Sequence, residues 1–425
     1  MIEQQKIFKT GSVLDYMKFA HLADCHIGSW RDPKLKDISS NAFSKAVELC
    51  IDKEVDFILI SGDLFNTSIP SIDSLKDTVE KLKELKDKNI PVYMIAGSHD
   101  FSPSGKTMLD VLEKAGLILN VAKGKTQDNR LKLNFTIDKK TGAKITGMLG
   151  KKGSLEKEYY ESLDKENLES EDGYKIFLFH SALTEFKPEE LKDIDSQPLS
   201  LLPKNFNYYA GGHVHYLFEK EEKDYGLIAF PGPLFPNSFK ELEDLERGSI
   251  NIVNVDENNK TTIQKEPIHL HNTFKINISA ENKTPAQVRE DINKAIEGKE
   301  LNNTIVTLRV HGTLFSGKPS DINFKEIFEK IYNKSAYFVM KNTNKLTTKE
   351  FEEIKVETGS VDDVESKIIK EHLGQIKVSN LTPDKEETLI KDLMDTLSTE
   401  KQEGETIATF ETRVKSEINS LIDLE

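Results

Sequence analysis

Short apolar runs alternate with amphipathic stretches along the first half of the chain. Compact apolar runs predict buried strands, and they occur at 17–25, 55–60, 91–96, 175–179, 207–210 and 226–230. Apolar residues at helical spacing predict amphipathic helices at 42–50, 72–85 and 109–115. The stripe expected on the second helix is Ile72, Leu75, Val79, Leu82 and Leu85. This alternation predicts an α/β fold in which helices cover a sheet.

The pattern changes near residue 274. Strands and helices then alternate in a smaller unit, at 274–279, 285–296, 304–312, 324–332 and 336–342. Beyond residue 360 the pattern is purely helical, with helices expected at 362–376, 383–398 and 406–424. A chain of 425 residues is too long for one ordinary core. We therefore expect a main domain at 17–273, a smaller α+β domain at 274–350, and an acidic linker with a helical region at 351–425.

The composition is that of a charge-rich globular protein, with 37% hydrophobic and 31% charged residues. No apolar run approaches the ~18–20 residues of a transmembrane helix, so no membrane partner is expected. Residues 1–16 lack the apolar core of a secretory signal. If Met17 is the true start, residues 1–16 are an addition that does not belong to the native protein. Cys25 and Cys50 make no disulfide framework, which favours a reducing cytoplasm.

The net charge of −14 argues weakly against a nucleic-acid partner, but the charge is unevenly distributed. Residues 275–350 contain 13 Lys and Arg against 9 Asp and Glu, whereas residues 351–425 contain 9 against 19. A mildly basic segment therefore precedes an acidic tail, and the total charge hides this asymmetry.

Aspartate and histidine recur where the predicted strands of the main domain end. Five such ends carry Asp24-Cys25-His26, Gly62-Asp63, Gly97-Ser98-His99-Asp100, His180 and Gly212-His213-Val214-His215. Ligand sites in α/β sheets gather at the carboxyl edge of the strands, so we expect these residues to converge.

The spacing of these residues points to metal binding. In extended backbone, residues i and i+2 point the same way, so Asp24 with His26, and His213 with His215, would each present two ligands to one site. Imidazole and carboxylate together suit Mn²⁺, Fe²⁺ or Zn²⁺. Two metals ~3.5–4 Å apart need a bridging carboxylate and several further ligands, which this set supplies. Each motif alone has a structural explanation, such as a turn or a loop histidine, but their order and shared position favour the metal site.

The order D-x-H, G-D, G-[N]-H-D, H and G-H-x-H resembles the calcineurin-like metallophosphoesterases. The segments HLADCHIGSWRDP, ISGDLFNTSIP, AGSHDFSP and GGHVH resemble more narrowly the SbcD-type nuclease family, the archaeal and bacterial counterpart of the meiotic-recombination-eleven repair nuclease. The resemblance covers about 17–350, including 230–248, whereas the tail is similar only in kind. It implies a four-layer α/β/β/α metallophosphoesterase sandwich, a smaller α+β capping domain at 274–350 and a C-terminal helical tail.

The resemblance also implies a role for each motif residue. One metal would be held by Asp24, His26 and His215, Asp63 would bridge both metals, and the second would take His180, His213 and the residue at position 98. The family usually has asparagine where this chain has Ser98, and a hydroxyl is a shorter and weaker neutral ligand. We therefore expect Ser98 to bind through a water or to leave the second metal loosely held. His99 would not be a ligand; it would protonate the leaving oxygen, and Asp100 would orient it.

By resemblance, the activity is that of a manganese-dependent DNA double-strand break repair nuclease. It would use two Mn²⁺ per chain, with Mg²⁺ as a substitute, for 3′→5′ double-strand exonuclease and single-strand endonuclease reactions. Because the metals grip phosphate, cleavage would be nearly independent of base sequence. The alternatives are another dinuclear metallophosphoesterase, such as a phosphatase or cyclic-nucleotide phosphodiesterase, and a DNA-binding scaffold with a weakened metal site.

The resemblance further implies partners. DNA, as double-stranded ends, hairpins or single strands, would be contacted from the capping domain, where the candidates are Lys275, Arg289, Lys294 and Arg309. A homodimer would form through helices 38–52 and 72–88, although their apolar stripe could equally pack on the sheet. The region 360–425 would bind an SMC-like coiled-coil ATPase, the only route by which ATP would act, or would pack on itself. The expected location is cytoplasmic and nucleoid-associated.

Overall fold

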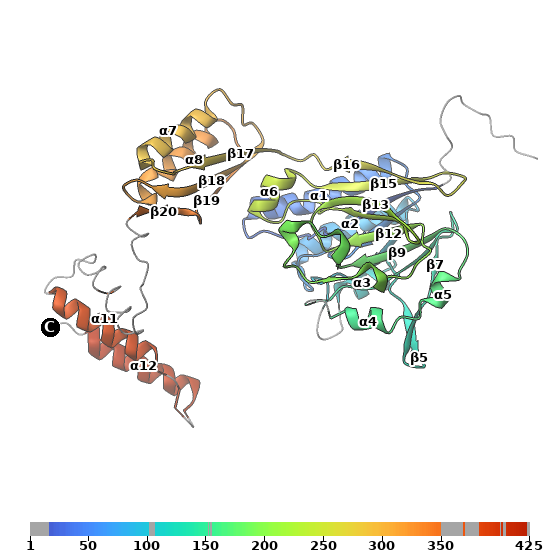
Figure 1. Ribbon diagram of the computed structural model, residues 1–425, viewed down its shortest axis with the longest axis horizontal. Coiled ribbons are helices and arrows are strands. Elements are labelled where there is room, and N and C mark those ends of the chain that lie inside the picture. Colours follow the sequence, from blue (N-terminus) through green and yellow to red (C-terminus); the bar gives the residue numbers. More distant parts are fainter. Residues whose placement is uncertain are drawn as a thin grey trace, which may run out of the picture. The chain divides into compact units, whose positions relative to one another are not determined.

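The structure is a computed structural model that describes residues 17–101, 107–151, 153, 155–349, 369, 382–399, 401–402 and 405–422 (Figure 1). Residues 1–16 and all of the expected helix 362–376 except Ile369 lie outside the described residues. Two compact units divide between Thr347 and Thr348. Within the described residues, none of the helices has the length and apolar content needed to cross a membrane.

Two six-stranded sheets form the main domain. The first has the order β16 (Thr261–Pro267), β15 (Ser249–Val255), β1 (Met17–Leu22), β2 (Phe57–Ser61), β3 (Val92–Ile95) and β4 (Leu119–Asn120). The second has the order β13 (Leu217–Glu222), β14 (Gly226–Pro231), β12 (Tyr208–Gly212), β9 (Lys175–His180), β8 (Lys144–Gly147) and β7 (Thr136–Ile137). Strands β1, β2 and β3 are mutually parallel, as are β9, β12 and β14.

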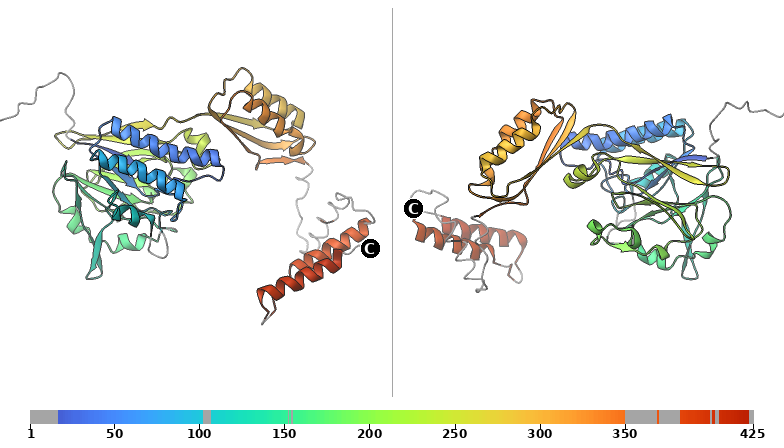
Figure 2. Two further views of the ribbon diagram at one scale, coloured as in Figure 1. Left: turned by 180° about the vertical axis from the view of Figure 1, so that it is seen from behind. Right: turned by 45° about the horizontal axis from the view of Figure 1, so that its top comes forward.

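The two sheets pack face to face because their central strands carry apolar side chains on both faces. Phe19, Phe57 and Leu59 point into the core between the sheets, where they meet Leu178 and Tyr208 of the second sheet. The other face of the first sheet is covered by α1 (Pro33–Asp52), α2 (Ile72–Asp87) and α3 (Met108–Lys114) (Figure 2). On the second sheet lie α4 (Lys157–Glu161), α5 (Glu166–Glu169) and the short helices η2 (Thr184–Phe186), η3 (Glu189–Leu191) and η4 (Leu199–Leu201). The expected four-layer α/β/β/α sandwich is confirmed.

Smaller elements complete the main domain. Two short ribbons consist of β5 (Gly124–Gln127) with β6 (Arg130–Leu133), and β10 (Ala182–Leu183) with β11 (Ser196–Gln197). Helix α6 (Phe239–Leu245) follows β14 and precedes the antiparallel strands β15 and β16.

Residues 272–348 form a smaller α+β module. Its sheet consists of β17 (Asn272–Ser279), β18 (Thr304–Leu314), β19 (Phe338–Asn342) and β20 (Leu346–Thr348). Helices α7 (Pro285–Ile296) and α8 (Phe324–Tyr332), with η5 (Pro319–Ile322), pack on it through their own apolar core. The domain boundaries at 273/274 and 350/351 stay predictions.

The tail contains α11 (Pro383–Leu397) and α12 (Ile407–Ile422), which pack against each other. Several apolar side chains of this pair remain exposed, namely Met394, Leu397, Ile407 and Ile422. The two helices therefore leave part of their apolar surface uncovered.

The structure corrects two expectations for the helices. Helix α1 begins at Pro33, ahead of both expected ranges, 42–50 and 38–52, because Asp32 caps its N-terminus and Pro33 suits the first turn. The stripe on α2 is also wrong at its start, since Ile72 is 84% exposed. Ser74, Thr78, Leu82 and Leu85 form the buried face instead.

Candidate metal centre

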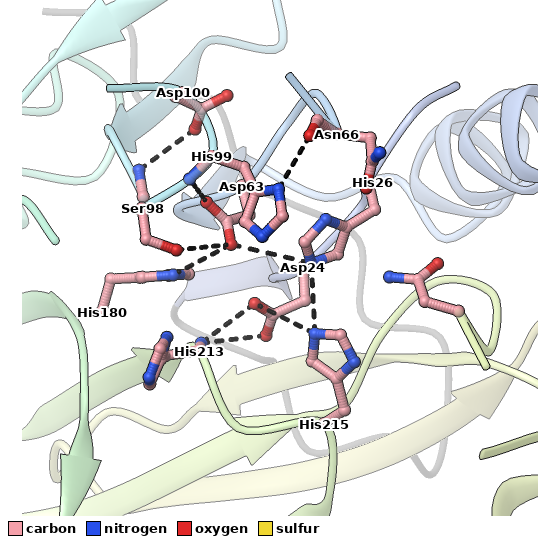
Figure 3. Close-up of polar contacts among 12 residues, drawn as sticks. Asp24, His26, Asp63, Asn66, Ser98, His99, Asp100, His180, His213 and His215 are labelled. Carbon is pink, nitrogen blue, oxygen red and sulfur yellow. Dashed lines mark hydrogen bonds and ion pairs between the residues drawn. The ribbon is translucent and has the colours of Figure 1, made fainter. Parts of the chain in front are cut away.

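Aspartate and histidine side chains from five strand ends meet at one edge of the sandwich (Figure 3). Strands β1, β2 and β3 of the first sheet lead to Asp24 and His26, to Asp63, and to Ser98 and His99. Strand β9 ends on His180, and β12 leads to His213 and His215. The expected convergence is thus present, and it draws on both sheets.

The local backbone differs from the predicted one. Strand β1 ends at Leu22 and β12 at Gly212, so neither the pair Asp24 and His26 nor the pair His213 and His215 lies in a strand. Instead Asp24, His26, Asp63 and His213 have positive φ angles of 49°, 42°, 53° and 88°. Such conformations cost about 1–3 kcal/mol each for residues other than glycine and concentrate at functional sites. Tight turns, rather than the strand pleat, aim these side chains inward.

Two glycines permit the close approach of the loops. Gly62 has φ +88°, and a Cβ there would lie 2.3 Å from His180 Nδ1. A Cβ on Gly97 would lie 2.3 Å from Asp63 Oδ1. Any larger residue at either position would displace a side chain of the site.

The first cluster contains Asp24, His26, Asp63 and His215. His26 Nε2 lies 3.1 Å from His215 Nε2 and 3.6 Å from Asp63 Oδ2. His215 Nε2 lies 3.8 Å from Asp24 Oδ1. Asp24, His26 and His215 place ligand atoms within 4.8 Å of one another, which is a spacing that can surround one cation.

The second cluster shares Asp63 with the first. His180 Nε2 lies 3.2 Å from Asp63 Oδ2, and the Ser98 hydroxyl donates to the same oxygen at 3.4 Å. Asp24, Asp63 and His180 form another group of ligand atoms within 4.8 Å. His213 is placed less directly: its ring centroid lies 5.2 Å from that of His180, and its backbone N–H donates to Asp24. Asp63 therefore stands between the two clusters, where a bridging carboxylate would be.

Hydrogen bonds at Nδ1 aim two of these imidazoles at the centre. His180 Nδ1 donates to the Ser61 carbonyl at 2.8 Å, and His215 Nδ1 donates to Glu241 Oε2 at 3.0 Å. Each ring therefore turns Nε2 toward the aspartates, as metal-binding histidines do when a second group holds their other nitrogen. The buried His180 Nε2 has no hydrogen bond of good geometry, despite its closeness to Asp63.

The ionisation of the cluster reflects its crowding. Burial lowers the pKa of His26 to about 3 and that of His213 to about 4, so both rings are neutral. Burial acts to lower the pKa of His180 as well, but the Asp63 and Asp24 carboxylates outweigh it and raise that pKa to about 10. A proton on His180 thus faces Asp63 at the place that a divalent cation would occupy. Histidines, carboxylates and a preferred place for positive charge fit a pair of divalent metals.

His99 and Asp100 do not form the expected pair. His99 Nδ1 donates to the Asn66 carbonyl at 2.7 Å, and its backbone N–H donates to Asp63 at 2.7 Å. The Asp100 carboxylate accepts the backbone N–H groups of Leu64, Phe65 and Gly97. The predicted role of Asp100 is therefore wrong: it ties two loops together, while a backbone carbonyl orients His99. The His99 ring contacts that of His26, with centroids 4.7 Å apart.

Sequence reasoning missed two supports of the site. Glu241 holds His215, but its signal, Ser238 followed three residues later by Glu241, is that of a helix cap. His21 is buried between the sheets, where its ring nitrogens lie 2.9 Å from the Tyr208 hydroxyl and 3.1 Å from the Ser61 hydroxyl. The backbone carbonyl of the same Ser61 accepts the hydrogen bond from His180 Nδ1. A histidine within an apolar strand gives no sequence signal of this position.

The predicted phosphate-binding cations differ in availability. Arg309 Nε donates to both oxygens of Glu243, and Lys275 Nζ donates to the Glu243 carbonyl and pairs with Glu246. Contact of these two residues with DNA stays a prediction. Lys294 pairs with Glu290 on the surface of α7, and Arg289 lies 4.0 Å from Glu326. Exposed pairs of this kind are weak and can exchange for phosphate.

Comparison with known proteins agrees with this geometry. Residues 17–217 match the calcineurin-like phosphoesterase family. The chain is 30% identical to the DNA double-strand break repair protein Mre11 of Methanococcus maripaludis, over 54% of this chain and 60% of that protein. It is 28% identical to the Mre11 protein of Archaeoglobus fulgidus over 54% of this chain and 53% of that one, so it spans little more than half of these two relatives. For the Mre11 protein of Sulfurisphaera tokodaii, identity is 27% over 85% of this chain and 89% of that protein.

Proposed function

Because residues 17–217 match the calcineurin-like phosphoesterase family, we propose that this chain is a metal-dependent DNA nuclease of double-strand break repair. The names of its relatives support the substrate. In this proposal two Mn²⁺ ions, replaceable by Mg²⁺, support 3′→5′ exonuclease action on duplex ends and endonuclease action on single strands.

Each side chain has a stated task in this proposal. Asp24, His26 and His215 would hold one metal, His180, His213 and Ser98 would lie around the other, and Asp63 would be shared by both. Bound divalent metals neutralise phosphate charge and lower the pKa of an attacking water. His99, held at Nδ1 by Asn66, keeps Nε2 available to protonate the leaving oxygen.

The observation that carries the proposal is the position of Asp63. One oxygen of this carboxylate, Oδ2, lies 3.6 Å from His26 Nε2 and 3.2 Å from His180 Nε2, so a single residue joins both clusters. A one-metal hydrolase or a structural ion site has no need for such a shared carboxylate. A carboxylate shared by two groups of ligands suits a pair of metals that act together on one phosphodiester.

The test compares two substrates under the same conditions. Purified chain is incubated with end-labelled linear duplex DNA and, separately, with p-nitrophenyl phosphate esters, each with Mn²⁺ or with EDTA. We expect Mn²⁺-dependent shortening of DNA from its 3′ ends. Activity on the small esters without any on DNA would favour a phosphatase or cyclic-nucleotide phosphodiesterase instead.

One observation favours a second candidate, a DNA-binding scaffold with a weakened metal site. Ser98 offers a neutral hydroxyl that already donates to Asp63, which supports loose binding of the second metal. Metal analysis separates the two functions. One or no bound Mn²⁺ per chain, with no cleavage even in excess Mn²⁺, would favour the scaffold.

The proposed partners rest on surfaces as well as on resemblance. Exposed Leu397, Ile407 and Ile422 on α11 and α12 support docking of an SMC-like coiled-coil ATPase within 360–425, through which alone ATP would act. Exposed Ile72 supports a homodimer through α1 and α2, whereas Leu75 and Val79 pack against the core of the main domain. DNA would reach the metals beside the module 272–348, where Arg289 and Lys294 carry exposed charge.

A further inference from the structure

Glu241 is the one carboxylate on α6 that reaches a proposed metal ligand. Its Oε2 accepts Nδ1–H of His215 at 3.0 Å, and both side chains are largely buried, with exposed fractions of 24% and 21%. Because His215 Nδ1 is engaged, its Nε2 is the nitrogen directed at Asp24 and His26.

The carboxylate of Glu241 is itself fixed. Oε2 also accepts the backbone N–H of Asn237 at 2.9 Å, and Oε1 accepts the Ser238 hydroxyl at 3.2 Å. Three donors therefore surround this one carboxylate. A carboxylate held in this way can orient an imidazole rather than follow its motion.

Helix α6 is anchored on its other side by the module 272–348. Glu243 accepts two hydrogen bonds from Arg309 Nε on β18, at 3.0 and 3.1 Å, and the Arg309 guanidinium lies 5.1 Å from the Phe239 ring. Strand β17 adds hydrogen bonds from Lys275 to the Glu243 carbonyl and from Thr273 to the Glu246 carbonyl, both at 2.7 Å. A seven-residue helix is too short to be rigid alone, so these contacts define where Glu241 lies.

We propose that Glu241 is a positioning residue for His215. We also propose that α6, which Arg309 anchors, keeps Glu241 at the position from which it orients the His215 ring. The inference rests on the proposed function, because it assigns His215 as a ligand. It gives segment 230–248 a task in the reaction: this segment carries the outer support of one metal. It also gives Arg309 a task other than contacting phosphate.

The alternative is that Glu241 only caps α6. A cap would contribute to folding stability but would leave metal affinity unchanged once the chain is folded. A group that supports a ligand changes metal affinity, typically by about 10–100-fold. Metal affinity measured on folded protein therefore distinguishes the two roles.

The test uses isothermal titration of Mn²⁺ into full-length metal-free protein, with circular dichroism as the folding control. For Glu241→Ala we expect one of the two Mn²⁺ sites to weaken by about 10–100-fold while the other keeps its affinity. Glu241→Gln retains an acceptor for His215 and should recover part of this loss. Asp244→Asn is the matched control, since Asp244 lies on the same helix, pairs with exposed Lys240 and makes no contact with His215 that the structure records.

A double variant makes the assignment specific. In a His215→Ala background, adding Glu241→Ala should weaken Mn²⁺ no further, because both changes act through the same ligand. Arg309→Gln should weaken the same site by a smaller factor. Wild-type affinity in folded Glu241→Ala would overturn the role of Glu241, and wild-type affinity in Arg309→Gln would overturn that of the clamp. Failure of the wild-type protein to bind two Mn²⁺ would instead overturn the proposed function.

Discussion

The Nε2 atoms of His26 and His215 lie 3.1 Å apart, although 189 positions separate the two histidines in the chain. Burial keeps His26 neutral, whereas Glu241 and Asp24 raise the pKa of His215 despite its burial. In the metal-free chain a proton on His215 can therefore bridge the two nitrogens. A divalent cation that replaces this proton gains both imidazoles as ligands without any change of fold.

Replacing His99 by alanine should separate catalysis from metal binding. If His99 protonates the leaving oxygen, His99→Ala should lower the cleavage rate by about 10²–10⁴-fold and leave two Mn²⁺ per chain. Nuclease assays and metal analysis of the same preparation measure both quantities. His311→Ala, on β18, serves as a control. Loss of a metal from His99→Ala would mean that His99 is a ligand, as its closeness to His26 and Asp63 would allow.

Asparagine at position 98 should strengthen the second metal site. Its carbonyl oxygen reaches further than the Ser98 hydroxyl, which now donates to Asp63 at 3.4 Å. We expect Ser98→Asn to lower the dissociation constant of the weaker Mn²⁺ by about tenfold, as measured by isothermal titration. Ser98→Ala, which removes the oxygen altogether, should shift it the opposite way. Equal affinities in all three proteins would show that position 98 does not contact the metal.

The sequence predicted the site better than it predicted how the site is built. Apolar runs located β1, β2, β3, β9 and β12, and parallel strands bring their carboxyl ends to one edge, so Asp24, Asp63 and His180 could be grouped in advance. The loop geometry could not be predicted, because only a small fraction of aspartates and histidines adopt a positive φ, and tertiary contacts decide that Asp24 and His213 do so.

The groups on distant elements that orient the site residues also could not be predicted from the sequence. Asp100 seemed suited to orient its neighbour His99, yet three backbone N–H groups satisfy it, and the carbonyl of Asn66 performs that task. Nearly every residue has the same backbone N–H and C=O groups, so residue identity does not show which of them will bind a side chain. Polar edge strands such as β13 were missed because LFEKEE lacks an apolar face.

Manganese binding should strengthen as the pH rises. His180 has a pKa raised to about 10 in the metal-free chain, so below that pH a metal must displace its proton. The neutral fraction grows tenfold with each pH unit in this range, and the apparent affinity of the second Mn²⁺ should grow by about the same factor between about pH 6 and 8. Titration in two buffers of different ionisation enthalpy measures the released protons. No proton release would contradict the predicted role of His180.

Alanine at position 62 should disturb the site by a steric clash, although it removes no ligand. Gly62 and Gly142 both have positive φ angles, +88° and +79°, so alanine at either position is strained by about 1–2 kcal/mol. Only at Gly62 would the new Cβ meet His180 Nδ1, at 2.3 Å, whereas nothing lies within 4 Å of a Cβ at Gly142. We expect Gly62→Ala to lower the free energy of unfolding by about 1–3 kcal/mol more than Gly142→Ala and to weaken the second Mn²⁺. Urea denaturation and manganese titration of both variants measure the difference, and equal behaviour would mean that His180 can move away without loss.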